Sequence, residues 1–216
     1  MPTPSIDIRF TFRTAWRAFA SNWSLFIAIE ATLVVCWLVL EGIVISGEKM
    51  GFGRAYNIGV HLVYLLFVSG LEVGLMRIGL DVDSGEKSSY RTLFLYLRSG
   101  PAFLLGKLLY LLMVLGGLLL LVVPGLQWAA RYAFFGFNMA DTGQGLIPSF
   151  RRSAQLTRTH GRQVLGFLVV LILFNLFGAI WMGAGLIASI PVSVLAMVGL
   201  FRQIGGTEEG FERVMD

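Results

Sequence analysis

The chain has 216 residues, of which 56% are hydrophobic and 14% are charged, and its mean hydropathy is +0.75. Soluble domains carry about 25% charged residues, so this composition excludes an ordinary soluble protein and predicts one integral membrane domain. The formal net charge of +4 indicates contact with anionic lipid headgroups rather than nucleic acid, and the single Cys36 excludes a disulfide framework.

Apolar stretches predict six membrane spans, because one span needs roughly 20 apolar residues. They are Ser24–Ser46, Ile58–Leu80, two spans within Pro101–Ala140 and two within Gln163–Ile204. Pro124 and Gly125 predict a tight turn that divides the third stretch, and the sequence GLIASIP divides the fourth. The predicted fold is therefore all-α, with six transmembrane helices arranged as three hairpins.

Basic residues are concentrated in the links on one side of these spans. The residues expected to face lipid headgroups are Arg9, Arg13, Arg17, Arg91, Arg98, Arg151, Arg152, Arg158 and Arg162. The opposite side carries only Lys49 and Arg54. Because positively charged links remain in the cytoplasm, this distribution predicts that both termini are cytoplasmic.

The three basic links align with one another without gaps. They read FRTAWRAFASNW from Phe12, YRTLFLYLRSGP from Tyr90 and FRRSAQLTRTHG from Phe150. The approaches to the second and third links also match, at Asp81 and Asp141 and at Gly85 and Gly145. The alignment predicts a threefold repeat with units at about 9–80, 88–140 and 147–204, followed by a cytoplasmic tail at 205–216. Parallel units imply a pseudo-threefold axis along the membrane normal.

Each repeat unit is expected to begin with a short cytoplasmic helix that lies in the membrane interface. In the first link the aromatic residues recur at helical spacing, namely Phe12, Trp16, Phe19 and Trp23, while the arginines occupy another face. The second link shows the same pattern, and the more polar third link is expected to stand further out of the membrane. The alternative is that the links are straight extensions of the spans that follow.

Several polar side chains fall within the predicted spans, where ionisable groups usually face a partner or a cavity. A helix rise of about 1.5 Å per residue sorts them into an inner layer of Glu30, Glu72 and Lys107 and an outer layer of Glu41 and Arg131, with Asn175 between the layers. One interpretation is structural pairing, of Arg131 with Glu41 and of Lys107 with Glu30 or Glu72. Another is a polar path for an ion or a headgroup, and Lys107 could also snorkel to the interface.

Other motifs add little chemistry. The chain has no HExxH, GxSxG or phosphate-loop motif, so no enzyme is indicated and no cofactor is expected. His61 and His160 fall on opposite sides of the predicted membrane, which argues against a haem held by both. Gly70 and Gly74 form a GxxxG pair, which allows close helix packing.

The segment from Pro124 to Gly161 combines a Pro-Gly turn, an arginine six residues later and the link SFRRSAQLTRTHGR. It resembles a group of bacterial six-span proteins that includes YciC-like inner-membrane proteins and the membrane domain fused to some glycerophosphodiester phosphodiesterases. The positions that fit this group are Pro124, Gly125, Arg131, Ser153, Leu156 and Thr157. The resemblance implies a bacterial inner-membrane location. It implies no enzymatic activity, because the phosphodiesterase half is absent.

Two functions are therefore expected. The first is a non-catalytic accessory or scaffold protein that contacts membrane lipids, a partner membrane complex, or both. The second is a small transporter or flippase-like protein that uses Glu30, Glu72 and Lys107 inside the membrane.

Overall fold

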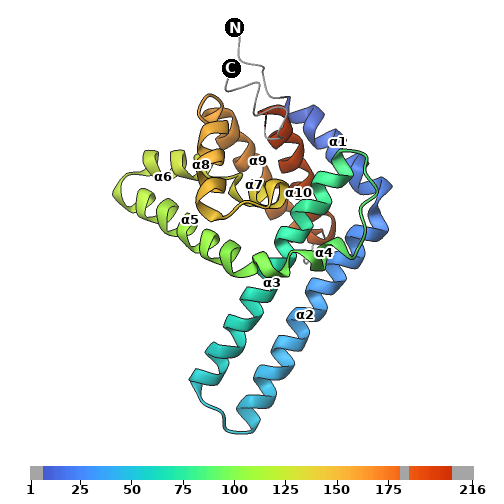
Figure 1. Ribbon diagram of the computed structural model, residues 1–216, viewed down its shortest axis with the longest axis vertical. Helices are drawn as coiled ribbons and strands as arrows, with labels where there is room; N and C mark the ends of the chain where they lie inside the picture. The colour runs from blue at the N-terminus through green and yellow to red at the C-terminus, as the bar shows by residue number, and fades with distance from the viewer. Residues whose placement is uncertain (1–6, 181–184, 206–216) are drawn as a thin grey trace.

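The computed structural model describes residues 7–180 and 185–205, and the described residues form helices and no strand (Figure 1). Five helical segments within them are long and apolar enough to cross a membrane. They are α2 (Trp23–Lys49), α3 (Arg54–Asp83), Thr92–Leu120, which contains α4 (Thr92–Leu95), η1 (Leu97–Ser99) and α5 (Gly100–Leu120), α9 (Gly161–Ile180) and α10 (Leu186–Gln203). This is the architecture of an all-α, multi-pass membrane protein. Apart from Gly205, the predicted tail lies outside the described residues.

Helices α2 and α3 form a long hairpin at the two first predicted spans. Gly51 lies in the turn with a φ of 79°, a left-handed conformation that a residue with a side chain rarely adopts. Near the turn the Asn57 amide donates to Glu48 Oε1 at 3.2 Å, which links the two helices. Figure 1 shows this hairpin projecting away from the other helices.

The reversal after α5 occurs earlier than the sequence predicts. It lies at Leu121, whose backbone is extended (φ −159°, ψ 135°), and α6 (Val122–Arg131) begins at the next residue. Pro124 stands in the first turn of α6, where its missing N–H costs no helical hydrogen bond. A Cβ atom on Gly125 would lie 2.5 Å from the backbone nitrogen of Leu118. The Pro-Gly pair therefore starts α6 and lets it pack closely on α5, and the predicted turn at this pair is wrong.

The expected fourth span is not one continuous helix. Helix α6 ends at Arg131, residues 132–134 form a turn, and α7 (Phe135–Thr142) follows. Every residue from Phe135 to Ala140 is buried, and the rings of Phe134 and Phe137 lie 5.7 and 6.1 Å from that of Phe201 on α10. The apolar run here fills the core of the protein instead of facing lipid. Hydropathy cannot separate these two environments.

The first link forms helix α1 (Ile8–Ser21), whose N-terminus is capped by the Asp7 carboxylate, which accepts from the Phe10 N–H at 3.0 Å. The predicted apolar face is divided between two surroundings. Phe12 packs against the rings of Phe167 and Phe174 on α9 at 5.6 and 5.5 Å. Trp16, in contrast, is exposed. Helix α1 is therefore partly covered by the helical body.

The second and third links differ from the first. The second contains only the short α4 and η1, and its Tyr90 hydroxyl lies 2.6 Å from that of Thr32 on α2. The third forms α8 (Leu146–Leu156), which is packed into the protein through Ser149, Phe150, Arg152, Ser153 and Leu156. Helix α8 covers the turn between α6 and α7, and the expectation that this link stands further out of the membrane remains a prediction.

Matched positions of the predicted repeat do not share one conformation. Gly85 has a φ of 75°, whereas Gly145 has a φ of −67° and precedes α8. Asp81 pairs with Arg77 on its own helix at 2.8 Å, whereas Asp141 lies 3.9 Å from Arg152 on the next helix. The threefold repeat and its axis remain predictions.

The GxxxG pair makes the close backbone contact that its sequence predicts. A Cβ atom on Gly74 would lie 2.3 Å from the Leu93 carbonyl oxygen, and one on Gly70 would lie 2.6 Å from Leu97 Cα. The partner surface is the α4–η1 segment, so these two glycines seat the second link on α3.

The end of α10 ties distant parts of the chain together. The Arg202 guanidinium donates to the Leu80 carbonyl at 2.8 Å, pairs with Asp83 at 2.8 Å and contacts the Ser84 hydroxyl. Basic side chains stabilise the free carbonyls at a helix C-terminus, so Arg202 caps the C-terminal end of α3. Helix α10 begins at Leu186, so the predicted divider GLIASIP falls mainly within that helix, with Pro191 inside it.

Candidate functional site

Two hydroxyl groups, one on α8 and one at the residue that follows it, hold the turn between α6 and α7. Ser153 Oγ donates to the Arg131 carbonyl at 3.0 Å and accepts from the Phe134 N–H at 3.1 Å. Thr157 Oγ1 also lies 3.0 Å from the Arg131 carbonyl oxygen. An unsatisfied backbone group in an apolar interior costs several kcal/mol, so these hydroxyls permit the chain to leave the helix here.

The same polar contacts are closed to solvent. Ser153 is fully buried and Thr157 is 2% exposed. The Asn138 amide donates to the Phe134 carbonyl at 3.0 Å and approaches the Ser149 carbonyl at 3.5 Å. Three of the residues that carry the resemblance to bacterial six-span proteins thus meet around one break: the Arg131 backbone, Ser153 and Thr157 are in contact.

The Arg131 side chain itself is exposed, unlike this buried network. Its guanidinium carbon lies 6.0 Å from the centre of the Tyr132 ring, and among the described residues it forms no ion pair with Glu41 or another acid. The expected Arg131–Glu41 tether is therefore wrong. Because α6 has only 10 residues and then breaks, α8 can lie beside Arg131.

Two adjoining hollows meet at Arg131 and Arg158, and we call their combined surface the arginine cleft. The first hollow has a volume of about 680 Å³ between α5, α6 and α8. Its basic residues are Arg131, Arg151 and Arg158, and its apolar wall consists of Leu109, Met113, Leu146, Ile147 and Phe150. The arrangement places charged groups beside an apolar surface.

The second hollow has a volume of about 740 Å³ and lies where α6 meets the start of α9. It adds Arg162 and His160 to the two shared arginines, and Gln127 and Gln163 also line it. Residues 161–163 of the first turn of α9 also line this hollow, and the first N–H groups of a helix have no acceptor within it. A helix N-terminus beside arginines favours an anion.

The four arginines of the cleft differ from the neighbouring Arg152. Arg131, Arg151, Arg158 and Arg162 are exposed, and within the described part of the chain none of them forms an ion pair. Arg152 is buried and lies 3.9 Å from the Asp141 carboxylate, so it does not face headgroups as the sequence suggests. Like charges without counter-charges create a positive potential that attracts anions.

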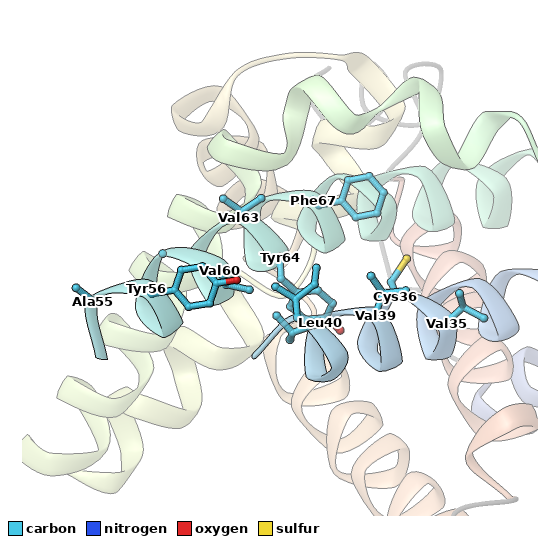
Figure 2. A pocket seen from close by; sticks show the side chains of 12 residues that line it. Val35, Cys36, Val39, Leu40, Ala55, Tyr56, Val60, Val63, Tyr64 and Phe67 are labelled. Carbon is cyan, nitrogen blue, oxygen red and sulfur yellow. The ribbon is translucent and has the colours of Figure 1, made fainter. Parts of the chain in front are cut away.

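A third hollow, of about 620 Å³, has a different chemistry. It lies between α2 and α3, and Figure 2 shows their side chains facing it, with Tyr56, Tyr64 and Cys36 among mostly aliphatic residues. None of its lining residues is charged. It suits an acyl chain, and it supplies no charged group that would recognise an ionic headgroup.

The predicted inner charge layer is partly a structural pair. Lys107 Nζ lies 2.6 and 2.8 Å from the two carboxylate oxygens of Glu72, and 5.8 Å from the centre of the Phe103 ring. Lys107 was expected to pair with Glu30 or with Glu72, and the structure shows the pair with Glu72. Glu30 Oε1 is buried without a hydrogen-bond partner among the described residues.

Asn175 links α9 to α10. Its amide nitrogen donates to Ser193 Oγ at 2.7 Å, and its amide oxygen accepts from Ser189 Oγ at 3.0 Å. This polar group is therefore used in helix packing. The other predicted headgroup contacts, Arg9, Arg13, Arg17, Arg91 and Arg98, are exposed, as such contacts require.

Comparisons of the chain with protein-family models, with curated proteins and with solved structures find no match. The assignment of the cleft therefore rests on its own geometry. Sequence reasoning missed the role of α8, although Ser149, Ser153 and Thr157 recur every four residues and so mark one face of a helix with hydroxyl groups.

Proposed function

We propose that this chain is a non-catalytic accessory or scaffold protein of the bacterial inner membrane that holds anionic lipid headgroups. The observation that carries the proposal is the arginine cleft, where four exposed arginines that have no acidic partner among the described residues adjoin an apolar wall. Membership of the six-span group, cytoplasmic termini and six membrane crossings are parts of the same proposal.

Physical chemistry supports a lipid as the ligand. Anionic lipids attract basic groups near a membrane surface with about 1 kcal/mol per Lys or Arg. Guanidinium groups bind phosphate oxygens through paired hydrogen bonds, and the wall from Leu109 to Phe150 offers a surface for an acyl chain. The exposed apolar residues of the α2–α3 hairpin supply further surface for lipid or for the helices of a partner complex.

The test is lipid selection from a defined bilayer. The protein is placed in nanodiscs of phosphatidylcholine mixed with phosphatidylglycerol, released into mild detergent, and weighed by native mass spectrometry. We expect retained phosphatidylglycerol above its share of the bilayer, and lower retention at high salt because charge attraction is screened. Retention in proportion to bilayer composition would contradict the proposal.

A transporter is the second candidate, and the buried Glu30 oxygen without a partner favours it. The variants Lys107→Leu and Glu72→Leu distinguish the two functions. Each removes one member of the intramembrane ion pair, which is a transport group under the second candidate and only a structural contact under the first. Loss of a transport activity in a correctly folded variant would support the second candidate. Loss of assembly alone would support a structural pair.

A further inference from the structure

We propose that the arginine cleft binds a lipid that carries two phosphate groups, with one phosphate in each hollow. This inference rests on the proposed lipid-binding function and narrows its ligand class. The chemistry required is a pair of linked phosphates attached to at least one acyl chain.

The placement of the arginines supports two phosphate positions rather than one. Arg131 and Arg158 line both hollows, whereas Arg151 lines only the first and Arg162 only the second. One phosphodiester has two free oxygens and one negative charge, so it would leave most of four guanidinium groups uncompensated. Two phosphates give each hollow one anion held between its own arginine and the shared pair.

The two hollows differ in a way that orients such a lipid. The first has the apolar wall, with Phe150 and Ile147 beside the arginines, so it accepts the beginning of an acyl chain. The second offers the N-terminus of α9 and a His160 ring nitrogen, Nε2, that is buried without a hydrogen-bond partner in the described chain. The N-terminus of α9 would bind a phosphate, and His160 would bind a hydroxyl on the group that links the two phosphates.

The helix break positions the shared Arg131. Its carbonyl is fixed by Ser153 and Thr157, and its side chain begins at the same residue and enters the cleft. Ser153 lines neither hollow, so it is a positioning residue that would act on the ligand through Arg131, whereas Thr157 also lines the second hollow.

The test compares two lipids at equal phosphate content. Nanodiscs of phosphatidylcholine contain either diphosphatidylglycerol (cardiolipin) or twice as much phosphatidylglycerol, and native mass spectrometry measures the lipid that each protein retains. We expect wild-type protein to prefer cardiolipin. Arg158→Gln should reduce that preference about tenfold, because it removes a charged hydrogen-bonding partner from both phosphates.

Three further variants test which hollow each phosphate occupies. Arg131→Gln should resemble Arg158→Gln, and Arg151→Gln or Arg162→Gln should have smaller effects because each reaches one hollow. Arg54→Gln, an exposed residue at the start of α3 and outside the cleft, is the matched control and should leave the preference unchanged. Gel filtration and thermal melting confirm that each variant is folded.

The outcomes separate this inference from the proposed function. Retention of both lipids without preference would overturn the two-phosphate site and leave the lipid-binding function standing. Loss of all anionic enrichment would overturn both. Inorganic pyrophosphate added to lipid-free protein distinguishes the source of the phosphates: if it binds as tightly as cardiolipin does, the lipid assignment is wrong.

Discussion

The α2–α3 hairpin and the α6–α7 segment both come from apolar stretches of the sequence, yet they fold in different ways. The first consists of two uninterrupted helices of 27 and 30 residues, whereas the second turns after Arg131 and returns as a buried eight-residue helix. The difference lies in side chains from elsewhere. Ser153 and Thr157 satisfy the backbone groups that the turn exposes. A membrane helix can therefore break where another segment replaces its lost hydrogen bonds.

The largest effect is expected from removing those hydroxyls. Ser153→Ala combined with Thr157→Val leaves the Arg131 carbonyl and the Phe134 N–H unsatisfied, at about 1–3 kcal/mol for each buried group. The free energy of unfolding, measured by denaturant titration in mixed micelles, should fall by several kcal/mol.

The α2–α3 hairpin provides the control. Ser46 Oγ donates to the Gly42 carbonyl at 2.7 Å on an exposed helix face, where no backbone group depends on it. Ser46→Ala should therefore be close to neutral. Equal losses in the two regions would show that the buried hydroxyls have no special role at the break.

A smaller loss is expected where α3 supports the second link. Gly74→Ala places a Cβ atom 2.3 Å from the Leu93 carbonyl oxygen, and such overpacking costs about 1–3 kcal/mol. Gly59 on the same helix has open space around it, so Gly59→Ala should be neutral or slightly stabilising. The same titration tests both variants. Equal stability of the two would contradict the close contact of α3 with Leu93.

The Glu72–Lys107 pair should contribute about 1 kcal/mol. Glu72→Leu and Lys107→Leu should each lower the free energy of unfolding, because each leaves one charge without its partner. The double variant should recover part of the loss. A double-mutant cycle measures this coupling, and strict additivity would show that the two groups do not interact.

The smallest effect on stability is expected at Arg131, because its side chain is exposed and forms no ion pair with a described residue. Arg131→Gln should change the free energy of unfolding by less than about 0.5 kcal/mol. A large loss would mean that Arg131 is a structural tether, as in the pairing with Glu41 that its sequence position suggested.

The contrast between the two regions also explains how much the sequence could predict. The spans Ser24–Ser46 and Ile58–Leu80 fall inside α2 and α3, because a long apolar run without breaks has one low-energy solution in a membrane. The break after Arg131 was not predictable in this way, since an apolar segment has the same composition whether it contacts lipid or a protein core.

The candidate site was predictable only in its components. Link arginines were expected to face headgroups, and those of the cleft are exposed as that requires; Arg152 is the exception because it lies against Asp141. The neighbours of Arg131 depend on where α8 packs, which is a long-range contact that local spacing does not encode. The sequence signal for this packing was the recurrence of hydroxyl residues at every fourth position, at Ser149, Ser153 and Thr157.

The central claim is that the arginine cleft, rather than basic charge in general, holds anionic lipid. Two double variants with the same loss of charge test it most directly: Arg131→Gln with Arg158→Gln in the cleft, and Lys49→Gln with Arg54→Gln beside the α2–α3 turn. Each is purified from phosphatidylglycerol-containing nanodiscs, and its retained lipid is counted by native mass spectrometry. We expect the α2–α3 variant to retain as much lipid as the wild type and the cleft variant to lose its enrichment. Equal retention by both variants would contradict the claim.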